Sequence, residues 1–155
     1  MELRKLCLEN PKIFRIETER SFQERLINFY RHYDSSIKGI NYLESVSDDS
    51  LGRDGYYLYC LYAKYYIYRN MPDEVELIYS AALKRYPNEG RLYKKVCLYY
   101  SNEKYHPQQI YSVLLDKSIS YCQQAIEKGL TDDTKNGFSG RLKRLEIQRS
   151  RLVSK

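Results

Sequence analysis

Tryptophan is absent from this 155-residue sequence, and phenylalanine, proline and histidine are scarce, with four, four and two copies. No Asn-Gly turn joins two alternating apolar runs, so the signals for β-hairpins are weak. The stretch "SLGRDG" has two glycines but lacks the Walker pattern and a preceding strand, which argues against a phosphate-binding loop. No apolar run approaches ~18 residues, so we expect no membrane-spanning helix and no membrane partner.

Metal-binding and catalytic patterns are also missing. The two histidines, His32 and His106, are expected on a helix surface and in a turn, away from any nucleophile that they could activate. The cysteines are widely separated and form no Cys-x-x-Cys pair. Three of them fall on apolar faces of predicted helices, where a thiol acts as a small hydrophobe. We therefore expect no enzymatic activity, no metal and no cofactor. The cysteines are Cys7, Cys60, Cys97 and Cys122.

The N-terminus has no apolar segment long enough for a secretory signal. Together with the wide spacing of the cysteines, this predicts a protein of a reducing compartment, cytoplasmic or nuclear.

Tyrosine and positive charge are what the sequence has in excess. Its 18 tyrosines can fill a core while their hydroxyls still reach water or a hydrogen-bond acceptor. The net charge of +6 makes this a basic protein and favours acidic partners, nucleic acid among them. The densest basic cluster is the C-terminal "GRLKRLEIQRSRLVSK". For this cluster a solvated terminal helix is favoured over a binding surface.

Apolar spacing and proline positions predict an all-α protein of antiparallel helices joined by short turns. The segment 72–86 illustrates the signals. Pro72 suits the first turn of a helix, Asp73 and Glu74 complement its positive end, and Pro87 ends it. The predicted helices are 2–9, 18–32, 35–46, 54–69, 72–86, 89–102, 107–128 and 134–153.

The chain is similar to itself at an offset of 34 residues. This shift places Tyr59 on Tyr93, Tyr62 on Val96, Ala63 on Cys97 and Tyr66 on Tyr100. A fixed offset of this size is typical of a repeat array, in which each unit buries its apolar face against the next.

Residues 56–89 resemble one tetratricopeptide repeat (TPR), a unit of two helices. That family's pattern of large, small and aromatic positions is matched by Tyr59, Tyr62, Ala63, Tyr66, Val75, Tyr79, Ala82 and Pro87. The small residues would let the two helices approach, and the aromatic ones would fill the wedge between successive pairs. The half-a-TPR variant, which is common in RNA-processing scaffolds, fits almost as well.

The resemblance predicts a single TPR-like helical domain over 1–155, an α-solenoid. A degenerate helix pair would occupy 18–46. A second repeat would occupy 90–129, where the second helix arrives about nine residues late, through an insertion or a lengthened helix. A helix at 134–153 would cap the array. Its single apolar stripe is Phe138, Leu142, Leu145 and Leu152.

In a TPR unit the first helix lines the concave face, so the resemblance implies which side chains face a groove. They are Tyr57, Cys60, Lys64, Ile67 and Tyr68 in the first unit, and Arg91, Lys94, Leu98, Ser101 and Asn102 in the second. The alternative is that these residues form a solvated face or pack flanking helices. Within the cluster of tyrosines, Tyr59, Tyr62 and Tyr66 would be core, and Tyr56 and Tyr65 would lie on the flanks.

These expectations lead to a functional hypothesis. The chain would be an adaptor or scaffold that binds an acidic or aromatic-containing segment of a protein partner in a basic, partly aromatic groove. The carboxylate clamp of chaperone-binding family members is not matched. A helical scaffold associated with RNA or other nucleic acid is the alternative. The predicted partner-binding residues are Tyr57, Lys64, Tyr68, Arg91, Lys94 and Asn102.

Overall fold

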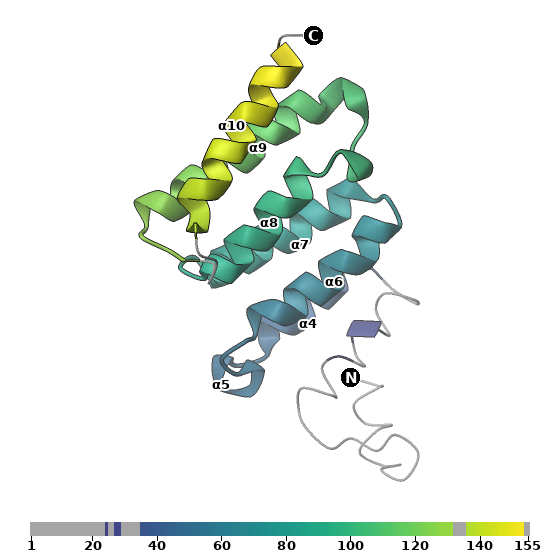
Figure 1. The fold of residues 1–155 in the computed structure, drawn as a ribbon. Helices are drawn as coiled ribbons and strands as arrows, with labels where there is room; N and C mark the ends of the chain where they lie inside the picture. Colours follow the sequence, from purple (N-terminus) through teal and green to yellow (C-terminus); the bar gives the residue numbers. More distant parts are fainter. Residues whose placement is uncertain (1–23, 25–26, 29–34, 132–135, 154–155) are drawn as a thin grey trace, which may run out of the picture. The chain divides into compact units, whose positions relative to one another are not determined.

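The computed structural model describes residues 24, 27–28, 35–131 and 136–153, and every regular element in these residues is helical (Figure 1). This confirms the all-α prediction. The predicted helix 2–9, most of 18–32, His32 and Cys7 lie outside the described residues. The helices are α4 (Ser36–Ser45), α5 (Asp48–Leu51), α6 (Tyr56–Tyr68), α7 (Pro72–Arg85), α8 (Gly90–Ser101), the 3₁₀-helix η1 (Glu103–Tyr105), α9 (Gln108–Glu127) and α10 (Gly137–Val153).

The chain divides into two compact units, Met1–Ala81 and Ala82–Lys155, and the division falls inside α7. In the first unit, α4 is fixed to both α6 and α7. Gly39 on α4 lies so close to α6 that an added methyl group would overlap the Tyr62 ring. The Tyr62 hydroxyl donates to the Ser35 carbonyl at 3.1 Å. The Ser36 hydroxyl donates to the Glu74 carboxylate on α7.

The residues predicted to fill the core around α6 are buried. Tyr59, Tyr62 and Ala63 have no exposed surface, and Tyr66 is almost completely enclosed. Rings of this size bury a large apolar area, which is the main favourable contribution to folding. The prediction that Tyr59, Tyr62 and Tyr66 are core residues is therefore confirmed.

Two helices end in the same way. Asn70 after α6 and Gly129 after α9 both have positive φ, of 55° and 68°. After α6, the Met71 amide donates back to the Tyr66 carbonyl, and after α9 the Leu130 amide donates to the Ala125 carbonyl. These are Schellman-type ends, in which a left-handed residue turns the chain and satisfies the last carbonyls.

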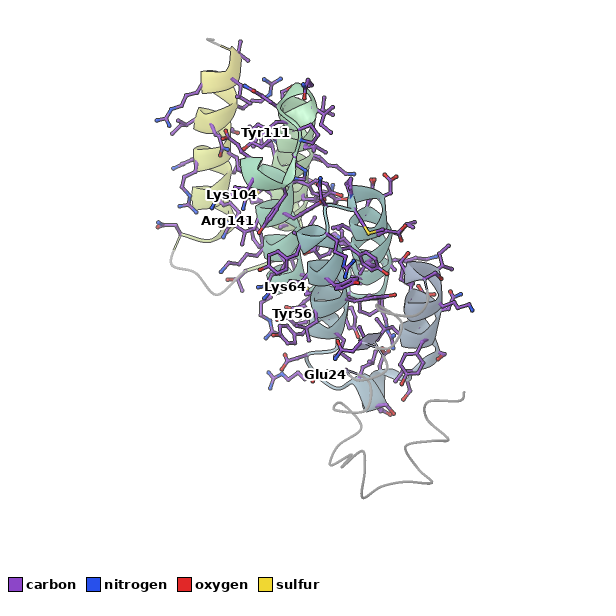
Figure 2. All side chains as sticks on the ribbon, turned by 90° about the vertical axis from the view of Figure 1, so that its right-hand side faces the viewer. Glu24, Tyr56, Lys64, Lys104, Tyr111 and Arg141 are labelled. Carbon is purple, nitrogen blue, oxygen red and sulfur yellow. The ribbon has the colours of Figure 1, made fainter. Side chains whose placement is uncertain are left out.

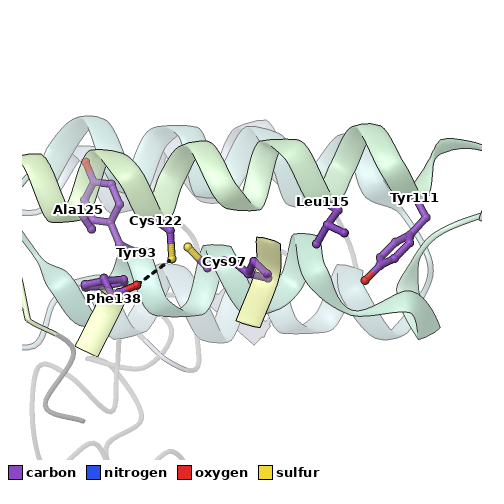
Figure 3. Packing of buried hydrophobic residues seen from close by; sticks show 8 residues of the cluster. Tyr93, Cys97, Tyr111, Leu115, Cys122, Ala125 and Phe138 are labelled. Carbon is purple, nitrogen blue, oxygen red and sulfur yellow. Dashed lines mark hydrogen bonds between the residues drawn. The ribbon is translucent and has the colours of Figure 1, made fainter. Parts of the chain in front are cut away.

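In the second unit, α8, α9 and α10 pack in sequence and run antiparallel. The hydrogen-bonded and ring-contact partners show the direction. Between α8 and α9, Tyr93 contacts Tyr121, and Ser101 accepts a hydrogen bond from Tyr111. Residue numbers therefore increase along α8 as those of their partners decrease along α9. From α9 to α10 the same holds for Cys122 with Phe138 and Asp116 with Arg149. The core between them is Tyr93, Cys97, Tyr111, Leu115, Cys122, Ala125, Phe138 and Leu145 (Figure 3).

The late second helix of the 90–129 segment is explained by a lengthened helix. The additional residues form η1 and the first turns of α9, a continuous helix of 20 residues. The short helix α5 was not predicted. Ser47 caps its start, because the Ser47 side chain accepts a hydrogen bond from the Ser50 amide. A helix of four residues is too short to show an apolar period in the sequence.

Candidate partner-binding surfaces

One face of α6 carries three of the predicted binding residues. Tyr57 and Lys64 are seven residues apart, and Tyr68 follows four residues later, which places all three on the same side of a helix. Tyr57 is 39% exposed and Tyr68 is 69% exposed, and Lys64 is exposed between them. Lys64 is labelled on this helix in Figure 2.

The exposed cations of α6 lie over aromatic rings. The Lys64 ammonium is 5.8 Å from the centroid of the Tyr68 ring. Beside it, the Arg69 guanidinium is 4.7 Å from the centroid of the Tyr65 ring. A cation held over a ring is attracted by the negative face of the π system. This arrangement places positive charge and apolar ring surface side by side at the C-terminal end of α6.

The α8 residues differ from one another in what they contact. Arg91 is paired with Glu89, with 2.9 Å between Nε and Oε1, and Glu89 also caps α8 through the Arg91 amide. Asn102 caps η1, since its Oδ1 accepts from the Lys104 amide at 3.0 Å. Both side chains therefore have local structural roles. Lys94 is half-buried.

The predicted set divides between the two units. The structure brings Tyr57, Lys64 and Tyr68 onto one face of α6, within residues 1–81. Arg91 and Lys94 lie on one face of α8, within residues 82–155. A single groove formed by both sets stays a prediction.

Two expectations about α6 are wrong. Cys60, predicted to face the groove, is buried with 6% exposure. Tyr56, assigned to the flank, is buried as well. The physical reason is that α6 is apolar around most of its circumference, so it is covered on more than one side. A single concave face deduced from repeat register does not describe such a helix.

The sequence did not indicate a cluster of aromatic rings around His106. The His106 ring stacks on Tyr100 at an interplanar angle of 12°, with 6.2 Å between centroids. Tyr100 is also stacked on Tyr121, and the Lys117 ammonium is 4.7 Å from its centroid. Tyr99 meets His106 edge-on at 4.8 Å. In the sequence an apparent turn separates the tyrosines of α8 from those of α9. The tyrosine content of α8 is the one signal that could have indicated the cluster.

His106 has a structural partner in this cluster. Its Nε2 lies 2.7 Å from the Tyr99 carbonyl, to which it donates. Burial lowers the pKa of the imidazole below its ordinary value, and the hydrogen bond to Tyr99 opposes that shift in part. His106 therefore holds the segment between α8 and α9 against the C-terminal end of α8.

The cysteines of the second unit are core residues. Cys97 and Cys122 have no exposed surface, and Figure 3 shows their side chains turned toward each other between α8 and α9. The Cys122 side chain, followed by burial, raises the pKa of the Cys97 thiol above its ordinary value. Ser118 links the same helices, since its hydroxyl donates to the Cys97 carbonyl at 2.8 Å. A protonated, enclosed thiol is a poor nucleophile.

Among the described residues, no group of three histidine, cysteine or acidic side chains is placed to hold a metal ion. In the same part of the chain, no helix is both long and apolar enough to cross a bilayer. No protein-family model, curated protein or solved structure matches this chain.

Proposed function

We propose that this protein is a protein–protein interaction adaptor or scaffold, and that the α6 face of Tyr57, Lys64 and Tyr68 contacts its partner. The observation that carries this proposal is the exposed Lys64–Tyr68 pair, with the Arg69–Tyr65 pair beside it. Tyrosine and arginine are enriched where proteins bind one another. The ring contributes contact area, and a neighbouring cation, here Lys64 or Arg69, favours a partner of negative charge.

The partner chemistry follows from this pairing. A carboxylate of the partner would meet the Lys64 ammonium, and an apolar or aromatic side chain would pack on the Tyr68 ring. The partner segment is therefore acidic, aromatic-containing or both. On α8, Lys94 would extend the same preference.

The TPR-like array is part of the same proposal. Its support is that the repeat positions Tyr59, Tyr62, Ala63, Tyr66, Val75, Tyr79 and Ala82 are all buried. A capping role for α10 is supported by its apolar stripe, since Phe138 and Leu145 are buried and Leu142 and Leu152 pack against the same cluster. The protein's location in the cell would be cytoplasmic or nuclear.

The experiment has two stages. Affinity purification of the tagged chain from its native host, followed by mass spectrometry, identifies candidate partners. Purified candidates are then titrated against the wild type, Lys64→Glu, Lys94→Glu and the double variant. We expect the double variant to lose binding. Lys95→Glu is the matched control, because Lys95 is an exposed lysine on α8 outside the predicted set.

The single variants separate the two helices. Binding that is lost in Lys64→Glu alone assigns the contact to α6, and loss in both assigns it to α6 and α8. A purified partner whose affinity is the same for the wild type and the double variant would show that neither lysine contacts it, and the proposed surface would be rejected.

A further inference from the structure

The positive charge of this protein is concentrated in one helix. Between Gly137 and Val153, α10 carries five arginines and lysines and one glutamate, which accounts for +4 of the chain's net charge of +6. The proposed function above does not use this positive charge.

The basic residues of α10 are not equivalent. Arg149 lies toward α9, where its Nε is 2.7 Å from Asp116 Oδ1. Lys143, Arg144 and Arg151 are exposed. Arg149 thus contacts α9, whereas the other three side chains face solvent.

The exposed cations surround an exposed isoleucine. Ile147 is 55% exposed and lies two residues from the buried Leu145, about 200° around the helix, and therefore opposite the face packed on α9. Lys143 and Arg151 are each four residues from Ile147, and Arg144 is three residues from it, so all four side chains share this outer face. Glu146, the one acidic residue of the helix, lies at its edge.

An exposed apolar side chain with cations on the same helix face fits a particular class of ligand. A nucleic-acid backbone would use the cations, but this face has no aromatic ring on which a base could stack. A lipid surface would need the broad apolar stripe of an amphipathic helix, and that stripe is packed in the core through Phe138 and Leu145. A protein segment with carboxylates around one apolar residue would satisfy both the charges and Ile147.

We propose that the outer face of α10 is a docking surface for an acidic, amphipathic segment of a partner protein. The carboxylates of that segment pair with Lys143 and Arg144, and one apolar side chain packs on Ile147. This surface shares no residue with the α6 face, and an adaptor requires two such surfaces if it is to hold two partners.

The test uses the full chain and a defined probe. A fluorescent helical peptide with glutamates around a central leucine is titrated by anisotropy at low salt. The control peptide has glutamine at each glutamate position. We expect Arg144→Glu to weaken binding about tenfold and Ile147→Ser to weaken it severalfold. Lys95→Glu, which makes the same change in net charge on α8, should alter binding less than about twofold. Circular dichroism establishes that each variant keeps its helix content.

The outcomes are separable. Loss of affinity in Arg144→Glu and Ile147→Ser, with Lys95→Glu unaffected, supports the proposal. Equal loss in Lys95→Glu, or equal binding of the glutamine peptide, shows nonspecific attraction and overturns it. Tighter binding of a single-stranded RNA or of phosphatidylserine vesicles, lost in Arg144→Glu, also overturns it in favour of that ligand. Lys64→Glu should leave peptide binding unchanged, so failure here does not bear on the α6 surface.

Discussion

Three buried tyrosines of this protein act both as core side chains and as hydrogen-bond donors to backbone carbonyls. The hydroxyl of Tyr62 donates to Ser35, that of Tyr93 to Pro87 at 3.2 Å, and that of Tyr111 to Ser101 at 2.6 Å. Each acceptor lies at or beside a helix end. Phenylalanine would fill the same volume without donating these hydrogen bonds, which gives a physical reason for tyrosine at these positions.

Tyr111 offers the sharpest test of this dual role. It joins three helices, because Gln148 of α10 donates to the Tyr111 hydroxyl and also to the Ser101 carbonyl at 3.4 Å. We expect Tyr111→Phe to lower the free energy of unfolding by about 1 kcal/mol, because it removes a partly buried hydrogen bond while the ring remains. Urea denaturation followed by circular dichroism measures the change.

The matched control is Tyr68→Phe, which makes the same chemical change on a ring that is 69% exposed. Its effect on stability should be close to zero. If Tyr111→Phe is also neutral, the hydroxyl network at the end of α8 does not contribute to stability.

His106 predicts a dependence of stability on pH. Because burial lowers its pKa in the folded protein, the unfolded chain binds the proton more readily, and stability rises with pH in that interval. The contribution is fully present above the ordinary pKa of about 6.5 and is lost as the pH falls through the lower pKa of the folded state. Unfolding curves between about pH 7.5 and 5 should therefore shift to lower urea.

The variant that checks this prediction is His106→Gln. It should reduce the dependence on pH between these values, although it also lowers stability throughout by removing the ring contacts of His106 with Tyr99 and Tyr100. A pH profile unchanged in His106→Gln would assign the titration to another group.

At the scale of the element, the contact between α4 and α6 is set by the absence of a side chain. Alanine usually stabilises a helix relative to glycine by about 1 kcal/mol. At Gly39, however, the added methyl would overlap the ring of Tyr62, a side chain with no exposed surface. We expect Gly39→Ala to lower the free energy of unfolding by about 1–3 kcal/mol, since overpacking displaces the helices.

Asn41→Ala is the control for this substitution, because Asn41 is an exposed position of the same helix. It should be neutral or slightly stabilising, as expected from helix propensity. Chemical denaturation of both variants decides the matter. A Gly39→Ala protein more stable than the wild type would mean that α4 can move away from Tyr62 at little cost.

Helices that could be predicted from the sequence are those with strong local signals. Pro72 and Pro87 bracket α7, and the observed helix Pro72–Arg85 is one residue shorter than predicted. The elements that were missed, α5 and η1, are short and directly follow Ser47 and Asn102, polar residues that cap them through their own side chains. Since four or three residues give no apolar period, only the caps distinguish them from loops.

The candidate site could be predicted less well, for reasons that concern the whole molecule. Helical register correctly indicated that Tyr57, Lys64 and Tyr68 share one face, because register is a local property. It could not indicate that Arg91 would pair with Glu89, or that His106 would stack on Tyr100. Such contacts depend on how the chain turns between helices. Register also could not indicate that Cys60 is buried, because its burial depends on what packs around α6.

Charge at the scale of the whole molecule provides the test that separates protein from nucleic acid as the partner. A net charge of +6 attracts any polyanion, so we expect weak binding to single-stranded RNA at about 50 mM salt. If that attraction is only electrostatic, it should fall by orders of magnitude by about 200 mM salt, because released counterions drive it. It should also be indifferent to Tyr68→Ala, since no base would stack on that ring. Gel shift and anisotropy titrations at both salt concentrations measure this. Micromolar RNA binding that survives moderate salt and is lost in Tyr68→Ala would instead identify the α6 face as a nucleic-acid surface.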